Sequence, residues 1–217
     1  MKSDYSRYVN NEVATNRRKF DVISLSQAEV WAIAKAWHSR HGERGNTQVP
    51  AETFALCQGI RNGSEMRAFS WALRRRVIGT DISPTVLQVP DGILCDFHEC
   101  PRLWSDRVCF LYSNAWDHSY DLDLLLEHWR GLMCNGGMIF LQYTPNSGSD
   151  AAIDLTGLVA KVSSRFRDVQ EVEITNPPQL VAICWWMFRR LRLCMQPFPP
   201  LPGPWPGPKT MLIWGVK

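Results

Sequence analysis

The stretch FALCQGIRNGSEMRAFSWALRRRVIGTD, residues 54–81, decides the fold. It opens with a short apolar segment and a loop that contains Gly59 and Gly63. A segment with apolar residues at helical spacing follows over 64–76, and a second apolar segment runs up to Asp81. Short apolar segments on either side of a helix are typical of parallel strands buried on both faces. The stretch therefore predicts a strand, a helix and a second, parallel strand.

The same alternation continues along the rest of the chain. We expect helices over 26–42, 64–76, 122–137 and 149–166, and strands over 53–59, 77–83, 92–99, 107–114, 138–144, 168–174 and 210–217. The first helix is marked by the capping-box spacing of Ser26 and Glu29, by an apolar face (Val30, Ile33, Ala34 and Trp37) and by Gly42 at its end. The alternation predicts an α/β fold with a Rossmann-like, seven-stranded, mostly parallel sheet flanked by helices.

Two segments fall outside the alternation. Residues 1–22 are polar and basic and predict no structure, so we expect 1–48 to form an N-terminal polar arm and helix, and 49–217 a single α/β domain. An aromatic and proline-rich insertion interrupts that domain at about 176–208. Its aromatic and cationic residues favour a lid or core helix followed by a rigid connector, and contact with a protein or a membrane surface through 181–205 is the alternative.

The composition of the chain narrows its class. It has 217 residues, of which 45% are hydrophobic and 21% charged, and this is typical of a globular protein. The net charge of +3 gives no strong nucleic-acid signal. Seven cysteines, with no C-x-x-C pair, favour a reducing, cytoplasmic location. The longest apolar run is too short for a transmembrane segment, and neither a serine-hydrolase nor a P-loop motif occurs.

Polar residues follow several of the predicted strands. Asp81 ends the second strand, Asp96 and Phe97 end the third, and Ser113 and Asn114 end the fourth. Because the carboxyl ends of parallel strands meet at one edge of a sheet, we expect these residues to line one ligand crevice. An acid at the end of the second strand can accept hydrogen bonds from ribose hydroxyls. An acid followed by an aromatic residue can bind the amine and the face of a purine.

The glycine spacing separates two classes of nucleotide-binding loop. A dinucleotide frame that starts at Gly59 requires glycines at 61 and 64, where the chain has Arg61 and Ser64, so a nicotinamide-dependent reductase is disfavoured. The frame typical of methyltransferases requires glycines at 59, 61 and 63, and two of these three positions match. An ordinary loop between a strand and a helix is the alternative on the glycines alone.

Three motifs carry a resemblance to a known family. RNGSE (61–65), DFHE (96–99) and SNAWDHSYD (113–121) resemble segments of class I S-adenosylmethionine-dependent methyltransferases, within them an uncharacterised group marked by RNGxE, DFHE and SNxxDHSYD. The resemblance extends from about Thr53 to Tyr143. It implies the class I methyltransferase fold, S-adenosyl-L-methionine as cofactor and methyl transfer as the reaction.

The resemblance also implies the residues of the cofactor site. Gly59, Arg61, Asn62 and Gly63 would line the methionine and ribose part, Asp81 and Ile82 would hold the ribose and flank the adenine, Asp96 and Phe97 would bind the adenine, and Ser113 and Asn114 would close the pocket. Cys57 stands where the superfamily often has an acid, and Glu65 would supply a carboxylate nearby. The Arg61 side chain could pair with the carboxylate of the cofactor, with Glu65 or with Asp81.

The loop after the fourth strand holds the catalytic candidates. His118, with Asp117 beside it, is the expected catalytic or acceptor-contacting group, and a loop histidine that only shapes the pocket is the alternative. No metal is expected, because the spacing of Cys95, His98 and Cys100 matches no common zinc pattern. We expect a methyltransferase whose unknown acceptor is a small molecule or sugar-like compound rather than nucleic acid. A catalytically inactive binding or scaffolding protein of the same fold is the alternative.

Overall fold

The computed structural model describes residues 2–21, 25–42, 50–144, 153–174 and 210–217. Its helices are α1 (Lys2–Arg18), α2 (Gln27–His41), α3 (Ser64–Leu73), α4 (Leu122–Leu132) and α5 (Leu155–Ser163), with short 3-10 helices at Pro84–Gln88, Arg102–Trp104 and Trp116–His118. Its strands are β1 (Phe54–Gln58), β2 (Val77–Asp81), β3 (Gly92–Leu94), β4 (Val108–Ser113), β5 (Met133–Tyr143), β6 (Arg167–Ile174) and β7 (Thr210–Val216).

The seven strands form one sheet in the order β3-β2-β1-β4-β5-β7-β6. β1 pairs in parallel with β2 on one side and with β4 on the other. Only β7 runs against its neighbours, since it pairs antiparallel with both β5 and β6. The predicted α/β fold with a seven-stranded, mostly parallel sheet is therefore confirmed. From β1 the chain adds β2 and β3 on one side and β4 and β5 on the other, so the strand order reverses between β1 and β4, and such a switch point is where parallel sheets bind ligands.

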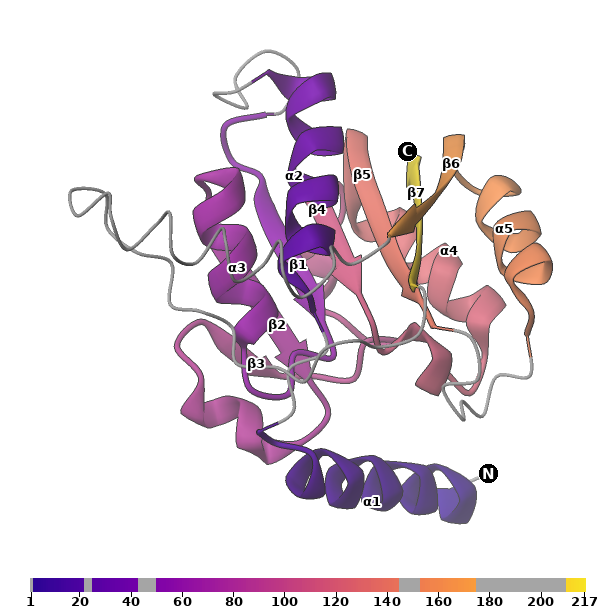
Figure 1. Cartoon of the computed structure of the whole chain (residues 1–217). Coiled ribbons are helices and arrows are strands. Elements are labelled where there is room, and N and C mark those ends of the chain that lie inside the picture. Colours follow the sequence, from indigo (N-terminus) through magenta and orange to yellow (C-terminus); the bar gives the residue numbers. More distant parts are fainter. Residues whose placement is uncertain (1, 22–24, 43–49, 145–152, 175–209) are drawn as a thin grey trace, which may run out of the picture.

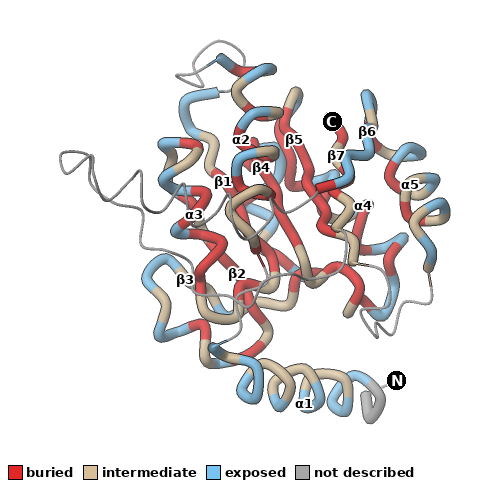
Figure 2. The backbone as a smooth tube through the Cα atoms, in the orientation of Figure 1, coloured by how far each residue is buried: buried red, intermediate tan, exposed pale blue. Residues whose placement is uncertain are grey.

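Helices cover both faces of the sheet (Figure 1). α2 and α3 lie on one face, where Trp37 packs edge-on against Phe110 with ring centroids 5.7 Å apart. α4 and α5 lie on the other face, where Trp129 is fully buried. Figure 2 shows the central strands β1, β4 and β5 as largely buried, whereas the edge strand β6 is mostly exposed. Two apolar cores thus hold the sheet from both sides and fix the positions of the strand ends.

α2 forms where the sequence predicted it. The Ser26 hydroxyl accepts from the backbone of Glu29 (3.3 Å), and the Glu29 carboxylate accepts from the backbone of Ser26 (2.6 Å), so the capping box is present. Gly42 ends the helix with φ of +75°, a conformation that favours glycine. The predicted apolar face is buried: Val30, Ile33, Ala34 and Trp37.

Some predicted boundaries are wrong. β3 ends at Leu94, so Asp96 and Phe97 lie in the loop beyond it rather than at the end of a strand over 92–99. α4 ends at Leu132, and β5 begins at Met133 rather than at 138, because Met133 pairs with Val108 across a shift in the β4–β5 register. These boundaries depend on pairing with a distant strand, which local apolar patterns do not record.

α1 is a helix in a segment for which the sequence predicted no structure. From residue 5 to residue 18 none of its residues is buried, so it lacks the apolar face that makes a helix recognisable. It lies across the carboxyl ends of the parallel strands (Figure 1). Polar contacts to these strand ends take the place of a buried face.

The aromatic and proline-rich segment at 176–208, and with it the contact expected over 181–205, lies outside the described residues. The division into an arm over 1–48 and a domain over 49–217 stays a prediction. Among the helices described, none combines the length and the apolar character needed to cross a membrane.

Replacing Trp37 with alanine should lower the free energy of unfolding by about 3–5 kcal/mol, because the substitution leaves a large cavity between α2 and the sheet. Trp31, on the same helix, is 51% exposed and is the matched control. Its replacement with alanine should cost about 1 kcal/mol or less. Urea unfolding followed by circular dichroism measures both, and equal losses would contradict the assigned core.

Candidate functional site

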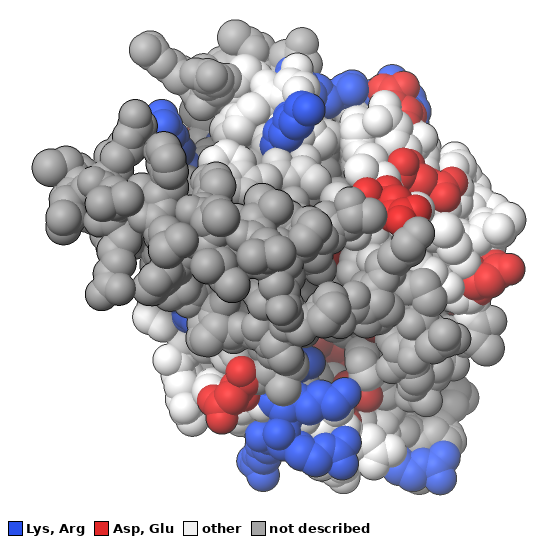
Figure 3. Space-filling model, viewed as in Figure 1, with Lys and Arg blue, Asp and Glu red and all other residues white. Residues whose placement is uncertain are grey.

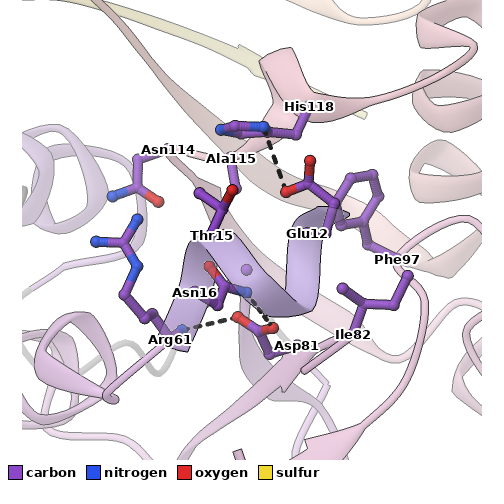
Figure 4. Close-up of a pocket in the computed structure, with 11 residues that line it drawn as sticks. Glu12, Thr15, Asn16, Arg61, Asp81, Ile82, Phe97, Asn114, Ala115 and His118 are labelled. Carbon is purple, nitrogen blue, oxygen red and sulfur yellow. Dashed lines mark hydrogen bonds and ion pairs between the residues drawn. The ribbon is translucent and has the colours of Figure 1, made fainter. Parts of the chain in front are cut away.

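A pocket lies at the carboxyl edge of the sheet, between the strand ends and α1 (Figure 4). Seven residues named from the sequence line it: Gly59, Arg61, Asp81, Ile82, Phe97, Asn114 and His118. Ala115 and three residues of α1, namely Glu12, Thr15 and Asn16, complete the lining. Residues from five separate stretches of sequence therefore meet at one place, and the parallel sheet predicted four of these stretches.

The loop after β1 is built on three left-handed backbone positions. φ is +76° at Gly59, +44° at Arg61 and +72° at Gly63. These are the three positions at which the methyltransferase frame has glycine. Arg61 thus adopts a left-handed conformation that favours glycine, and a side chain is strained there. The loop has this glycine-type backbone at the position where the sequence departs from the frame.

Close packing also requires glycine at two of these positions. A Cβ added at Gly59 would lie 2.4 Å from the Cβ of Ala115, and one added at Gly63 would lie 2.4 Å from a methyl group of Val89. The loop after β1 therefore touches the loop after β4 on one side and the segment after β2 on the other.

Asp81 stands at the centre of the site. Its Oδ2 accepts a hydrogen bond from the backbone N–H of Arg61 (2.9 Å), and its Oδ1 accepts from the backbone N–H of Ser83 (2.8 Å) and from the Asn16 side chain (2.7 Å). Burial raises the pKa of Asp81, and these hydrogen bonds together with the nearby Arg61 charge oppose the rise. The carboxylate joins the glycine loop, the end of β2 and α1.

Of the two residues expected to bind the adenine, only one lines the pocket. Phe97 lines the pocket, whereas Asp96 is bonded within the protein. Oδ1 of Asp96 lies 2.8 Å from both the backbone nitrogen and Nδ1 of His98, and Oδ2 accepts from the Tyr5 hydroxyl at 2.8 Å. Burial raises the pKa of Asp96, but the hydrogen bonds from His98 outweigh it, so that the net shift is downward.

Four other predicted residues lie next to the pocket without lining it. Glu65 is buried, and its carboxylate accepts from the Ser64 hydroxyl (3.0 Å) and from the Asn114 side chain (3.3 Å). Ser113 donates to the backbone carbonyl of Gln58 (3.2 Å), and the Asn62 side chain donates to the backbone carbonyl of Phe20 (2.6 Å). Gly63 precedes α3 as its N-terminal cap. Glu65 thus orients Asn114, which does line the pocket.

His118 faces α1 across the pocket. Its Nδ1 lies 3.4 Å from Glu12 Oε2, and its Nε2 lies 4.0 Å from Asp117 Oδ1. The hydrogen bond with Glu12 raises the pKa of His118, and partial burial opposes this only in part. Asp117 is itself mostly buried and does not line the pocket. The ring of His118 is therefore the group of this pair that can reach a ligand.

The residues of α1 are the part of the site that the sequence did not predict. Tyr5, Glu12 and Asn16 each contact a predicted site residue. Together with Tyr8 they follow one another at spacings of three and four, which places them along one side of a helix. That periodicity is a signal in the sequence, but it is made of polar residues and does not stand out by hydrophobicity.

The cysteine and histidine side chains considered as metal ligands form hydrogen bonds within the protein. His98 bonds to Asp96 and Ser119, and Cys100 accepts from the Gln58 side chain at 3.2 Å. Within the ranges that the structure describes, no three or more histidine, cysteine or acidic side chains are grouped so as to hold a metal ion.

Comparison with known proteins shows what fold this is. No protein-family profile and no curated protein matches the chain. Among solved structures it is similar to Burkholderia thailandensis 1,6-didemethyltoxoflavin-N1-methyltransferase with bound 1,6-didemethyltoxoflavin and S-adenosylhomocysteine, with a TM-score of 0.61 and 12% identity over 100% of this chain and 90% of that one. A SAM-dependent methyltransferase from Archaeoglobus fulgidus has a TM-score of 0.53 and 14% identity, over 86% of this chain and 94% of that one.

Haemonchus contortus phosphoethanolamine N-methyltransferase 2, in complex with S-adenosyl-L-methionine, is also similar, with a TM-score of 0.53 and 16% identity. The match covers 86% of this chain and 52% of that one, so the chain spans about half the length of this relative. At such identities the likeness establishes the fold. The chain has the Rossmann-like fold of class I methyltransferases, and its structural neighbours include enzymes solved with S-adenosylmethionine or S-adenosylhomocysteine bound.

The Glu12→Gln substitution should lower the pKa of His118, because it removes the carboxylate that stabilises the protonated ring. Because the pKa of His118 is raised in the folded protein, protonation of the ring stabilises the fold. This stabilisation is complete below the usual pKa of about 6.5 and is lost as the pH rises through the folded pKa. The wild type should therefore be more stable than the variant at pH 6, and the difference should vanish in alkaline solution.

NMR titration of the His118 ring measures the pKa, and thermal melts at several pH values measure the stability difference. Asn11→Ala, an exposed change on the same helix, is the control. An unchanged His118 pKa in the glutamine variant would contradict the Glu12 contact.

Proposed function

We propose that the protein is an S-adenosylmethionine-dependent methyltransferase. The observation that carries the proposal is the loop at 59–63, whose three left-handed positions are those of the methyltransferase glycine frame, beside the buried carboxylate of Asp81. The loop ends β1 and the carboxylate ends β2, at the switch point of a sheet with the class I methyltransferase fold. The DFHE and SNAWDHSYD motifs flank the same pocket and support the finer resemblance to the group that carries them.

The residues present fit this cofactor. Gly59 and Arg61 would hold its methionine part, the Arg61 guanidinium by pairing with the carboxylate, and Asp81 would accept from the ribose hydroxyls. Ile82 and Phe97 offer apolar surface to an adenine ring. Asn114, oriented by Glu65, would close the methionine end. Asp96 would accept a hydrogen bond from the adenine amine, and Asn62, Gly63 and Ser113 would shape the site through their hydrogen bonds beside the lining.

When bound, the cofactor supplies an electrophilic methyl group on a sulfonium. The chain must then align an acceptor, exclude water and, where the acceptor starts protonated, remove a proton. His118 is the pocket residue suited to accept that proton, with Asp117 close to its Nε2. A protonated ring cannot act as a base, so the group works only after its contact with Glu12 is broken or the pH exceeds its pKa.

The acceptor that we propose is a small molecule or sugar-like compound. Lys and Arg side chains gather on the surface at the edge where α1 crosses the sheet (Figure 3). This charge supports an acceptor that carries an anionic group. Contact with a protein or a membrane surface through 181–205, and a cytoplasmic location, remain predictions. No contact among the described residues favours the scaffolding alternative over catalysis.

Cofactor binding tests the proposal directly. S-adenosylmethionine and S-adenosylhomocysteine should each raise the melting temperature, since a ligand at 100 times its dissociation constant stabilises by about 2.7 kcal/mol. Asp81→Asn should weaken the affinity by roughly tenfold or more, because it removes a charged acceptor. Asp91→Asn is the control: Asp91 pairs with Arg76 outside the pocket, so this change should leave the affinity unaltered. Absence of a shift with both compounds in folded wild type and in folded Asn16→Ala alike, or a shift with NADH alone, would reject the proposal.

His118→Ala should leave the affinity for S-adenosylhomocysteine within about threefold of wild type, because the cofactor's predicted contacts are made by other residues. Isothermal titration calorimetry checks this. Loss of binding would instead place His118 in the cofactor pocket and remove it as the catalytic candidate.

A further inference from the structure

The polar groups predicted for the cofactor are already bonded to the N-terminal segment. Tyr5 donates to Asp96 (2.8 Å), and Asn16 donates to Asp81 (2.7 Å). The Arg61 side chain donates to the backbone carbonyl of Lys19 (3.4 Å), and the Asn62 side chain to that of Phe20 (2.6 Å). From the adenine end of the site to the glycine loop, residues 5–20 thus contact it at four places. Glu12, which pairs with His118 at 3.4 Å, adds a fifth.

The bonding capacity of Asp81 shows why these contacts matter. A carboxylate offers about four acceptor positions. Arg61, Ser83 and Asn16 take three of them in this structure. A ribose with two vicinal hydroxyls donates two hydrogen bonds. Asp81 can therefore accept both only when Asn16 has left.

α1 also blocks access to the two carboxylates of the site. Asp81 is 2% exposed, and Asn16 lies over it in the pocket (Figure 4). Asp96 has one oxygen committed to His98, and Tyr5 donates to the other. Both carboxylates that would recognise the nucleoside are thus covered by side chains of α1.

α1 is held by polar and aromatic contacts rather than by buried apolar side chains. None of its residues from 5 to 18 is buried, whereas α2 buries Val30, Ile33 and Trp37. Segments with little buried apolar surface open at low free-energy cost. A ligand that bonds to the same carboxylates can therefore replace α1 without unfolding the core.

We propose that α1 is a strap that competes with the cofactor: in this state its side chains hold the groups that would bind the ribose and the adenine, and the cofactor must displace it. The inference rests on the proposed function and adds a regulation of that site. Displacement of α1 also separates Glu12 from His118. Cofactor binding would then free the candidate base in the same step.

Titration of the full chain with S-adenosylhomocysteine tests the competition. The variants are Asn16→Ala, Tyr5→Phe and the double variant. Asn11→Ala, an exposed asparagine on the same helix, is the matched control. We expect the double variant to bind about tenfold more tightly than wild type or better, because fewer bonds hold α1 over the site. Each single variant should lie between, and the control should stay within about twofold.

Two results of this titration would overturn the inference, and only one of them also rejects the proposed function. Binding by wild type with unchanged or weaker affinity in the double variant would reject the strap and leave the cofactor site standing. No binding by any of these proteins would reject the proposed function and the strap together. Binding by the double variant but not by wild type would support both.

Hydrogen–deuterium exchange on the wild type gives a readout that needs no substitution. Saturating S-adenosylhomocysteine should speed exchange of the backbone amides of α1, since the helix leaves the strand edge, while exchange in α2 stays unchanged. Slower exchange in α1 would show that the helix closes over the cofactor, and would overturn the competition.

Discussion

One hydrogen bond, from the backbone N–H of Arg61 to the carboxylate of Asp81, holds the site together. It ties the loop after β1 to the end of β2, and so depends on the parallel pairing of these two strands in the sheet. It also explains how Arg61 is kept at φ of +44°, a conformation that costs a non-glycine residue free energy. Burial of Asp81 strengthens the bond, because a buried carboxylate cannot replace it with a hydrogen bond to water.

Much of the fold follows from the sequence by elementary patterns. Short apolar segments between helical segments predicted the strands, and the capping box of Ser26 and Glu29 predicted the start of α2. The boundaries of β3 and β5 could not be predicted, because they depend on which residues pair across the sheet. Met133, for example, becomes part of a strand only by pairing with Val108.

The candidate site likewise has a part that the sequence predicted and a part that it did not. Gly59, Asp81, Asn114 and His118 meet because parallel strands end at one edge, and the sequence shows where each strand ends. α1 could not be predicted in this way. It has no buried residue from 5 to 18, so its placement depends on contacts with residues far along the chain, such as Asn16 with Asp81. Where the protein uses polar side chains to hold a helix, hydrophobic periodicity gives no guide.

The contact between Gly59 and Ala115 constrains how this site can change. With only a hydrogen on Gly59, the loops after β1 and β4 pack so closely that a methyl group there would overlap the Ala115 side chain. The two loops therefore form one rigid wall, and a larger residue on either side requires a compensating change on the other. Engineering of this wall therefore has to change positions 59 and 115 as a pair, because enlargement at either one alone makes the two loops overlap.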